Sequence, residues 1–177
     1  MTAEPPLPTL VTMKILIAYD GSADAKAAVT LAGHLFDGST AVVLTVWEGL
    51  ATVVSRAEAG LSSSLDFDRI EAECKHAADA LAVDGAGHAR AAGLQAEARA
   101  VQRRGSIADA ILEEAAEAGA ELIVVGTRGL SGVKSFLLGS VSRAVLQRSS
   151  LPVLVAPSAA RRTEQPAIGE PFLSANL

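Results

Sequence analysis

The chain has 177 residues, of which 50% are hydrophobic, 20% charged and 3% aromatic, and its formal net charge is −5. This length and composition fit one globular domain with a sizeable core and exclude an intrinsically disordered chain. The negative charge and the few aromatic side chains argue against a nucleic-acid-binding surface, and the single cysteine, Cys74, excludes internal disulfides and a cysteine-based metal cluster.

The first predicted elements are an arm, a strand and a helix. Residues 1–12 contain three prolines and have no regular period, which predicts a flexible arm. Lys14–Tyr19 is a short apolar run of the kind that forms a buried parallel strand. It ends in Asp20-Gly21-Ser22, and Ser22 can cap a helix that runs toward Phe36.

The middle of the chain continues the alternation. Thr40–Trp47 is predicted to be a second strand, and residues 48–65 form a polar stretch with no assigned structure. Arg69–Ala92 is predicted to be a helix with four apolar residues on one face, namely Ile70, Cys74, Ala77 and Leu81. Leu94–Val101 is a weaker third strand.

Ser106 and Asp109 resemble a capping box that opens the next helix. The apolar face of this helix carries four residues, Ile107, Ile111, Ala115 and Ala118. Glu121–Val125 is predicted to be a fourth strand, Ser140–Arg148 a short helix and Pro152–Ala156 the last strand.

The alternation of five strands and four helices indicates one doubly wound α/β domain over residues 13–157, with parallel strands and helices on both faces of the sheet. Residues 158–177 are expected to form a flexible tail. Apolar runs such as Leu122–Val125 are too short to span a membrane. The N-terminus lacks the basic and apolar regions of a secretory signal, so we expect a cytoplasmic protein.

A glycine-spaced segment after the fourth strand is the main candidate for a binding site, because ligands of doubly wound sheets bind beyond the carboxyl ends of the strands. Gly126 and Gly129 could adopt positive φ and let backbone N–H groups converge on an anion. Gly139 precedes the helix at Ser140, whose first N–H groups have no acceptor within the helix. The alternative is that the loop is only a turn and Gly139 only a helix entrance.

Charged residues near this segment have open roles. Asp20 could stabilise the turn after the first strand, accept a hydrogen bond from a ribose, or hold a magnesium ion. Arg128 or Lys134 could add positive charge. Gly85-Ala86-Gly87 is interpreted as a helix stop, and His34, His76 and His88 as helical surface or packing residues. The sequence contains no P-loop, Rossmann glycine motif, His-Glu-x-x-His motif or serine-hydrolase elbow.

Three segments resemble a universal stress protein domain, and the resemblance extends over about residues 13–157. They are Lys14–Ser22, Ala120–Gly129, and Leu137–Ser142 together with Leu151–Val155. The ATP-binding branch of that family carries Gly, two residues, Gly, nine residues, and then Gly-Ser or Gly-Thr. This chain carries that spacing, which implies an adenine-nucleotide site and a sheet order of 3-2-1-4-5.

The resemblance implies a role for each matching position. Ala18 and Val46 would flank adenine, Asp20 would lie near ribose or metal, and Val125 and Val141 would flank the phosphate segment that contains Arg128. The complete predicted site consists of ten residues, Ala18, Asp20, Val46, Val125, Gly126, Arg128, Gly129, Gly139, Ser140 and Val141. No catalytic residue and no metal site of the protein's own is predicted.

Members of the family commonly dimerise through the last strand, and an apolar edge strand favours pairing with its own copy. We therefore expect a homodimer formed through Pro152–Ala156. It would bind ATP, ADP or AMP, with or without Mg²⁺, and act as a stress-response or signalling module with at most slow hydrolysis. The alternatives are an ATPase or adenylyl-transfer enzyme, and a structural dimer without bound nucleotide.

Overall fold

The computed structural model describes residues 12–49, 67–129 and 138–157. The tail expected at 158–177, nearly all of the arm expected at 1–12, most of the polar stretch 48–65, and Lys134 lie outside the described residues. The described part contains no helix that is both long enough and apolar enough to cross a membrane.

Five parallel strands form one sheet in the order β3-β2-β1-β4-β5, which confirms the predicted fold class and strand order. The strands are β1 (Lys14–Ala18), β2 (Thr40–Trp47), β3 (Gln95–Gln102), β4 (Leu122–Gly126) and β5 (Val153–Ala156). The helices are α1 (Ala23–Leu35), α3 (Phe67–Ala91), α4 (Ile107–Glu117) and α5 (Ser140–Arg148). These bounds agree with the predicted ones to within a residue or two.

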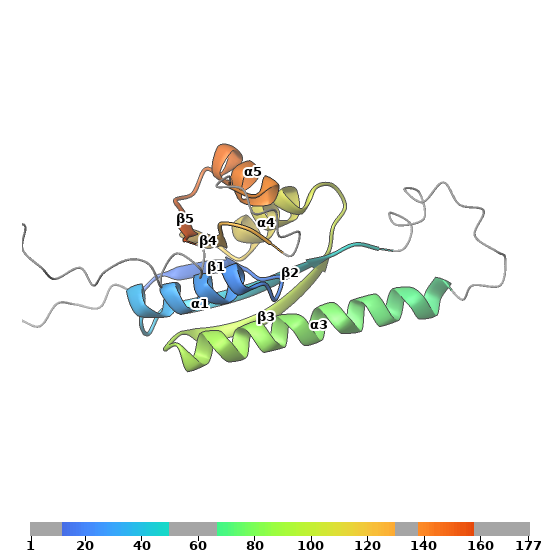
Figure 1. Ribbon diagram of the computed structural model, residues 1–177, viewed down its shortest axis with the longest axis horizontal. Helices are drawn as coiled ribbons and strands as arrows, with labels where there is room; N and C mark the ends of the chain where they lie inside the picture. The colour runs from blue at the N-terminus through green and yellow to red at the C-terminus, as the bar shows by residue number, and fades with distance from the viewer. Residues whose placement is uncertain (1–11, 50–66, 130–137, 158–177) are drawn as a thin grey trace, which may run out of the picture.

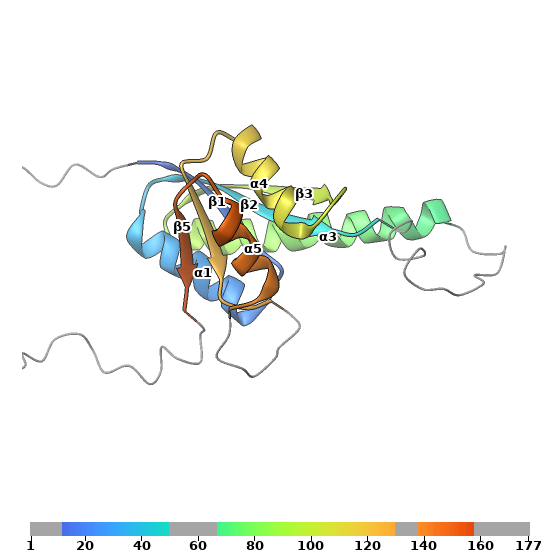
Figure 2. The same ribbon diagram turned by 90° about the horizontal axis from the view of Figure 1, so that it is seen from above.

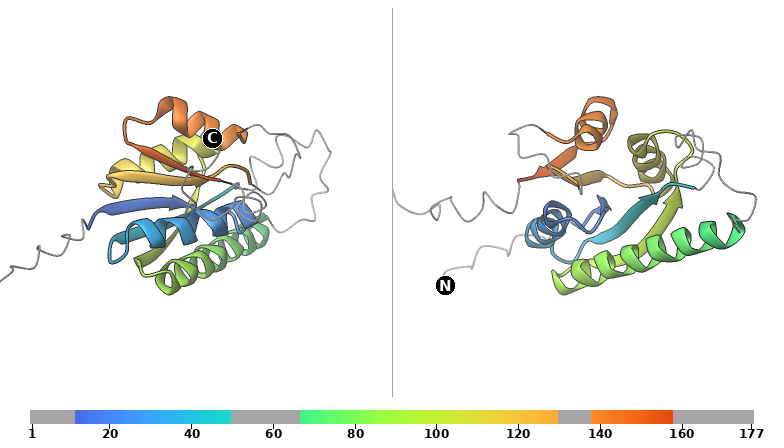
Figure 3. Two further views of the ribbon diagram at one scale, coloured as in Figure 1. Left: turned by 60° about the vertical axis from the view of Figure 1, so that its left-hand side comes forward. Right: turned by 45° about the vertical axis from the view of Figure 1, so that its right-hand side comes forward.

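Helices cover both faces of the sheet (Figure 1). Helices α1 and α3 lie on one face, and α4 and α5 lie on the other, as the two views of Figure 3 show. Seen from above, β5 lies at one edge of the sheet. The N-terminal end of α3 extends past the sheet on the side away from β5 (Figure 2).

Residues that alternate along the strands build two separate cores. Ile15, Ile17 and Val43 point toward α1 and α3, in a cluster rich in small alanines of those helices. Leu16 and Leu44 point toward α4 and α5, in a second cluster. Because side chains of a strand alternate between its faces, a sheet covered on both sides needs the continuous apolar runs seen in the sequence.

The buried face of α3 differs from the predicted one. Ala78, Ala82, Gly85, Ala86 and Ala89 are buried, whereas Cys74 and Ala77 of the predicted face are exposed. The helix packs mainly small residues on the sheet, together with the partly buried Leu81 of the predicted face, because the close approach of its backbone leaves little room for larger side chains.

The interpretation of Gly85-Ala86-Gly87 as a helix stop is wrong, because α3 continues to Ala91. A Cβ atom at Gly85 would lie 2.6 Å from Cδ1 of Tyr19 and 2.8 Å from Cγ1 of Val43. Gly85 therefore serves the close approach of α3 to the sheet. The helix instead ends before Gly93, which has a φ of +98° and so adopts a conformation that favours glycine.

Candidate functional site

A cleft of about 420 Å³ opens at the carboxyl ends of β1, β2 and β4, where the strand order reverses. Its size falls within the range of small-molecule sites, and its place is the one at which doubly wound sheets bind ligands. Fourteen residues line it, Ala18, Tyr19, Asp20, Leu44, Val46, Ile107, Ile111, Val125, Arg128, Gly129, Gly139, Ser140, Val141 and Ser142.

Nine of the ten residues of the predicted site lie around this cleft. They come from the ends of β1, β2 and β4, from the loop after β4, and from the start of α5. The tenth, Gly126, is buried at the end of β4 and packs against the backbone of Asp24, so it supports the cleft from behind.

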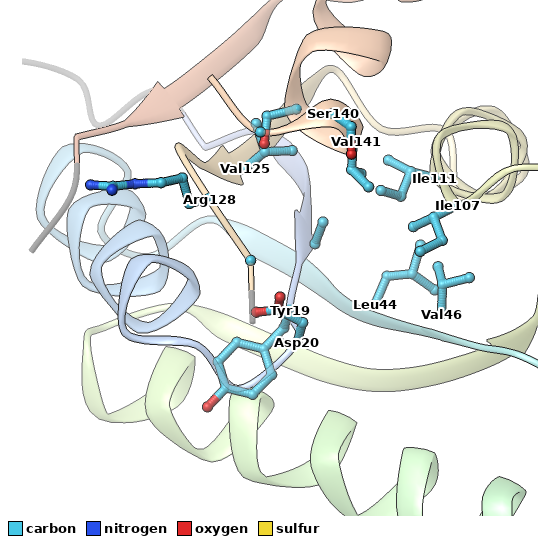
Figure 4. A pocket seen from close by; sticks show the side chains of 14 residues that line it. Tyr19, Asp20, Leu44, Val46, Ile107, Ile111, Val125, Arg128, Ser140 and Val141 are labelled. Carbon is cyan, nitrogen blue, oxygen red and sulfur yellow. The ribbon is translucent and has the colours of Figure 1, made fainter. Parts of the chain in front are cut away.

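One wall of the cleft is apolar. Val46 and Leu44 of β2 face Ile107 and Ile111 of α4, and Val141 of α5 lies nearby (Figure 4). Such a wall suits the flat, weakly polar face of an aromatic base.

The predicted site did not include Leu44, Ile107 or Ile111, which line this wall. One signal in the sequence pointed to Ile107 and Ile111, which belong to α4. The capping box predicted the start of α4 correctly, with the Ser106 hydroxyl accepting from the Asp109 N–H and the Asp109 carboxylate accepting from the Ser106 N–H. In a parallel sheet, a helix that follows a strand begins near the carboxyl ends of the strands, where the cleft lies. Which side chains of α4 reach the cleft depends on the tilt of this helix.

The opposite end of the cleft is formed by the start of α5 and the loop after β4. The Gly139 N–H donates to the Thr127 carbonyl over 2.8 Å, and the Ser142 hydroxyl donates to the Gly126 carbonyl over 2.7 Å. These bonds hold the helix start against the end of β4. Helix α5 begins at Ser140, and its first N–H groups cannot bond within the helix, which makes them donors for an anion.

The glycines of the segment have a different role from the expected one. Positive φ angles occur at Gly21, Gly38, Gly93 and Gly119 among the described residues, and thus not at Gly126, Gly129 or Gly139. Gly126 and Gly129 thus do not use the positive φ that the sequence allowed them, and Gly139 has an ordinary extended backbone with φ −58° and ψ 156°.

Close approach explains these glycines instead. A Cβ atom at Gly126 would lie 2.8 Å from the carbonyl carbon of Asp24, and one at Gly129 would lie 2.5 Å from Oδ2 of Asp20. At Gly139 the nearest atom, the Thr127 carbonyl oxygen, would be 3.2 Å away. The three positions lack side chains because the loop, α1 and α5 are pressed together.

Asp20 has both a turn role and a place at the cleft. Its Oδ1 accepts from the Ser22 N–H over 3.0 Å, which stabilises the turn into α1. The same side chain lines the cleft next to Gly129. It is the one carboxylate among the described lining residues.

Arg128 borders the cleft, but its guanidinium lies elsewhere. In Figure 4 its side chain points away from the other labelled residues. Its Nε lies 3.6 Å from Oδ2 of Asp24, in the first turn of α1. The guanidinium thus faces a carboxylate outside the cleft.

Tyr19 closes the cleft on the side of α3. Its hydroxyl donates to Oδ2 of Asp84 over 2.7 Å. Burial, and next the hydrogen bond to Asp84, raise the pKa of the Tyr19 phenol well above its usual range. The phenol therefore stays protonated and acts as a fixed donor to α3.

The histidines and the cysteine lie away from the cleft. His34, His76 and His88 lie on exposed faces of α1 and α3, as expected, and Cys74 is exposed on α3. Within the described ranges, no group of three or more histidine, cysteine or acidic side chains could hold a metal ion.

Comparisons with known proteins agree with the predicted family and fold. The family described as "Universal stress protein family" matches residues 12–157 of the chain. The universal stress protein YxiE of Bacillus subtilis is 36% identical over 151 residues, which cover 80% of this chain and 97% of that protein.

Solved structures resemble this one. A universal stress protein in complex with cAMP has a TM-score of 0.57 and 26% identity, and the match covers 84% of this chain and 98% of that one. The universal stress protein of Archaeoglobus fulgidus in complex with dAMP has a TM-score of 0.54 and 22% identity, with 83% and 98% covered. From the family match and the relative in Bacillus subtilis, the chain belongs to the universal stress protein family.

Proposed function

We propose that this protein binds an adenine nucleotide in the cleft and serves as a stress-response or signalling module. The observation that carries the proposal is the joining of an apolar wall and a helix N-terminus in one cleft of about 420 Å³. A nucleotide has the matching polarity, with an aromatic base at one end and anionic phosphates at the other. Structural relatives in complex with cAMP and dAMP support adenine as the base.

Within this proposal, each part of the cleft has a task. Val46 and Ile107 pack against the base, Asp20 accepts from the ribose, and the N–H groups at the start of α5 receive the phosphates. A magnesium ion that accompanied ATP would take most of its ligands from phosphates and water, so one carboxylate, Asp20, could complete its shell.

We propose further that hydrolysis is at most slow. Among the described residues that line the cleft, the only carboxylate is Asp20 and none is a histidine. In this proposal Asp20 is engaged by the ribose and by the Ser22 N–H, so these residues offer no second carboxylate to orient a water molecule. An ATPase or adenylyl-transfer enzyme would require a general base that this lining does not supply.

Ser140 offers a sharp test of the phosphate end. It is the first residue of α5, where proline is well tolerated, and Gly139 before it has the extended backbone that a following proline requires. Ser140→Pro therefore removes one N–H donor and keeps the helix, whereas the control Ser140→Ala removes only the hydroxyl.

Isothermal titration with ATP and AMP reads the result. We expect the parent to bind, Ser140→Ala to bind a few-fold more weakly, and Ser140→Pro to lose about tenfold or more, as for a hydrogen bond to a charged group. All three should melt at similar temperatures. The proposal is wrong if the parent binds neither nucleotide, or if Ser140→Pro binds like the parent.

Ile107 tests the base end. An acidic residue is favourable in the first turn of a helix, so Ile107→Glu should retain α4 while placing a charge on the apolar wall. We expect this variant to lose affinity for AMP. Inorganic triphosphate should not compete with AMP at equal concentration, because it lacks the base that the wall contacts.

We propose in addition that two copies pair through β5. This strand lies at the edge of the sheet and is bonded to β4 alone among the described strands. Ile123 and Thr127 donate to the carbonyls of Pro152 and Ala156, so the polar groups of Val155 point outward. Val155→Pro should convert a dimer into a monomer in analytical ultracentrifugation, and a monomeric parent would contradict the proposal.

A further inference from the structure

Asp24 is a buried carboxylate beside the phosphate end of the cleft. It lies in the first turn of α1 and is 8% exposed. A buried charge requires compensating partners. The Thr127 hydroxyl donates to Oδ2 of Asp24 over 3.0 Å, and Nε of Arg128 lies 3.6 Å from the same oxygen. Two successive residues of the loop after β4 are therefore bound to one side chain of α1.

Backbone contacts hold the same two segments together. Gly126 packs directly against the backbone of Asp24, where a Cβ atom would lie 2.8 Å from its carbonyl carbon. The Ser22 hydroxyl, at the start of α1, lies 3.5 Å from the Arg128 carbonyl oxygen. Backbone contacts thus seat the loop on α1, and the Arg128 side chain lies beside the Asp24 carboxylate.

The direction of Arg128 determines the charge of the cleft. Asp20 and Arg128 are the charged side chains among its described lining residues. With the guanidinium turned toward Asp24 (Figure 4), the phosphate end has the N–H groups of α5 and a nearby carboxylate, but not this cation. A helix N-terminus is equivalent to about half a positive charge. This charge offsets a larger share of the negative charge of one phosphate than of three.

We propose that Asp24 is a positioning residue that holds Arg128 out of the cleft, so that the cleft favours adenine nucleotides with one phosphate over those with three. This inference rests on the proposed nucleotide binding and concerns its specificity. Asp24→Asn keeps the shape of the side chain and an oxygen for the Thr127 hydroxyl, but loses the charge that attracts Arg128. In that variant the guanidinium can turn toward the phosphates.

The test is a titration of AMP and ATP against four proteins: the parent, Asp24→Asn, Arg128→Gln and the double variant. Asp24→Asn should raise the ratio of ATP to AMP affinity by about tenfold, as expected for a new guanidinium–phosphate contact. Arg128→Gln alone should change ATP affinity by less than about twofold, since its charge is already outside the cleft. The double variant should lose the gain.

A matched control separates this effect from a general change of charge. Glu114→Gln also removes a partly buried carboxylate from an ion pair with arginine, the 3.0 Å pair with Arg99 between α4 and β3. It should leave the ratio of ATP to AMP affinity unchanged. Residues outside the described part are identical in all variants. A change in the ratio of ATP to AMP affinity therefore reports the effect of the Arg128 side chain.

Two results would overturn the proposal: a ratio that Asp24→Asn leaves unchanged, or an Arg128→Gln variant that binds ATP about tenfold more weakly in the native background. If the parent binds neither nucleotide, the proposed function fails. The four proteins then still decide on the role of Asp24 through urea unfolding without ligand. A coupling between Asp24 and Arg128 of about threefold or more in the unfolding constant supports it, and no coupling refutes it.

Discussion

Gly85 and Gly87 lie on the same helix, but replacing each by alanine should change the stability of the protein in opposite directions. Both lie inside α3, where replacing glycine by alanine ordinarily stabilises by about 1 kcal/mol through backbone entropy. A Cβ atom at Gly87 has nothing within 4 Å, so Gly87→Ala should obtain this gain in full.

At Gly85 the same Cβ atom would meet the core. It would lie 2.6 Å from Cδ1 and 2.8 Å from Cγ of Tyr19, and 2.8 Å from Cγ1 of Val43. These atoms belong to a buried ring and a strand residue, which cannot move independently of the sheet. Overpacking of this kind costs about 1–3 kcal/mol, and contacts of 2.6–2.8 Å place Gly85→Ala in the upper part of that range. The variant should therefore be destabilised by about 1–2 kcal/mol net of the helical gain of about 1 kcal/mol.

Urea unfolding followed by circular dichroism measures both variants under identical conditions. With a typical urea dependence, the two midpoints should differ by about 1 M or more, with Gly87→Ala above the parent and Gly85→Ala below it. Since Tyr19 also lines the cleft, Gly85→Ala should weaken nucleotide binding as well. Equal midpoints for the two variants would refute the packing of α3 on Tyr19.

Three further predictions concern α4 and the wall formed by Tyr19. Ser106→Ala removes the cap of α4 and should lower the free energy of unfolding by about 1 kcal/mol in urea; no loss would argue against the capping box. The Ser106 hydroxyl first, and Arg148 next, lower the pKa of Asp109 to about 2. Because the pKa of Asp109 is lower in the folded protein than in the unfolded chain, its contribution to the free energy of unfolding should be present above pH 3.8 and lost as the pH falls toward 2. Asp109→Asn should flatten that part of the acid-unfolding curve. Burial and Asp84 raise the pKa of Tyr19, the only tyrosine, so its tyrosinate absorbance should appear above pH 10.0, and at a lower pH in Asp84→Asn than in the parent. Because the folded pKa is raised, the stability of the protein should fall as the pH rises past 10.0. Ionisation of Tyr19 in the folded protein at its ordinary pKa would contradict this.

Local patterns in the sequence predicted most of the fold. Ser22 and Ser106 marked two helix starts, because a capping side chain bonds to a backbone N–H only three residues away. The apolar runs Lys14–Tyr19 and Thr40–Trp47 predicted central strands, since both faces of the sheet are covered. Contacts of this range depend on neighbouring residues, which is why their bounds agree with the structure.

Features that depend on how elements meet were not predicted. The glycine spacing identified the phosphate segment, but the reason for the glycines, contact with Asp24, Asp20 and Thr127 rather than positive φ, depends on where α1 and α5 pack. The same holds for the buried face of α3.

The apolar wall and the direction of Arg128 are the clearest cases. Ile107 and Arg128 are both recognisable in the sequence, one in a helical face and the other in a glycine loop. Only the packing of α4 over β2 brings Ile107 to the cleft, and only the proximity of α1 turns Arg128 toward Asp24. The sequence alone thus determined the order of the strands and helices and the segments that border the cleft. The tertiary structure decided which side chains enter it, because that choice depends on contacts between residues about 100 or more positions apart in the chain, such as Asp24 and Arg128.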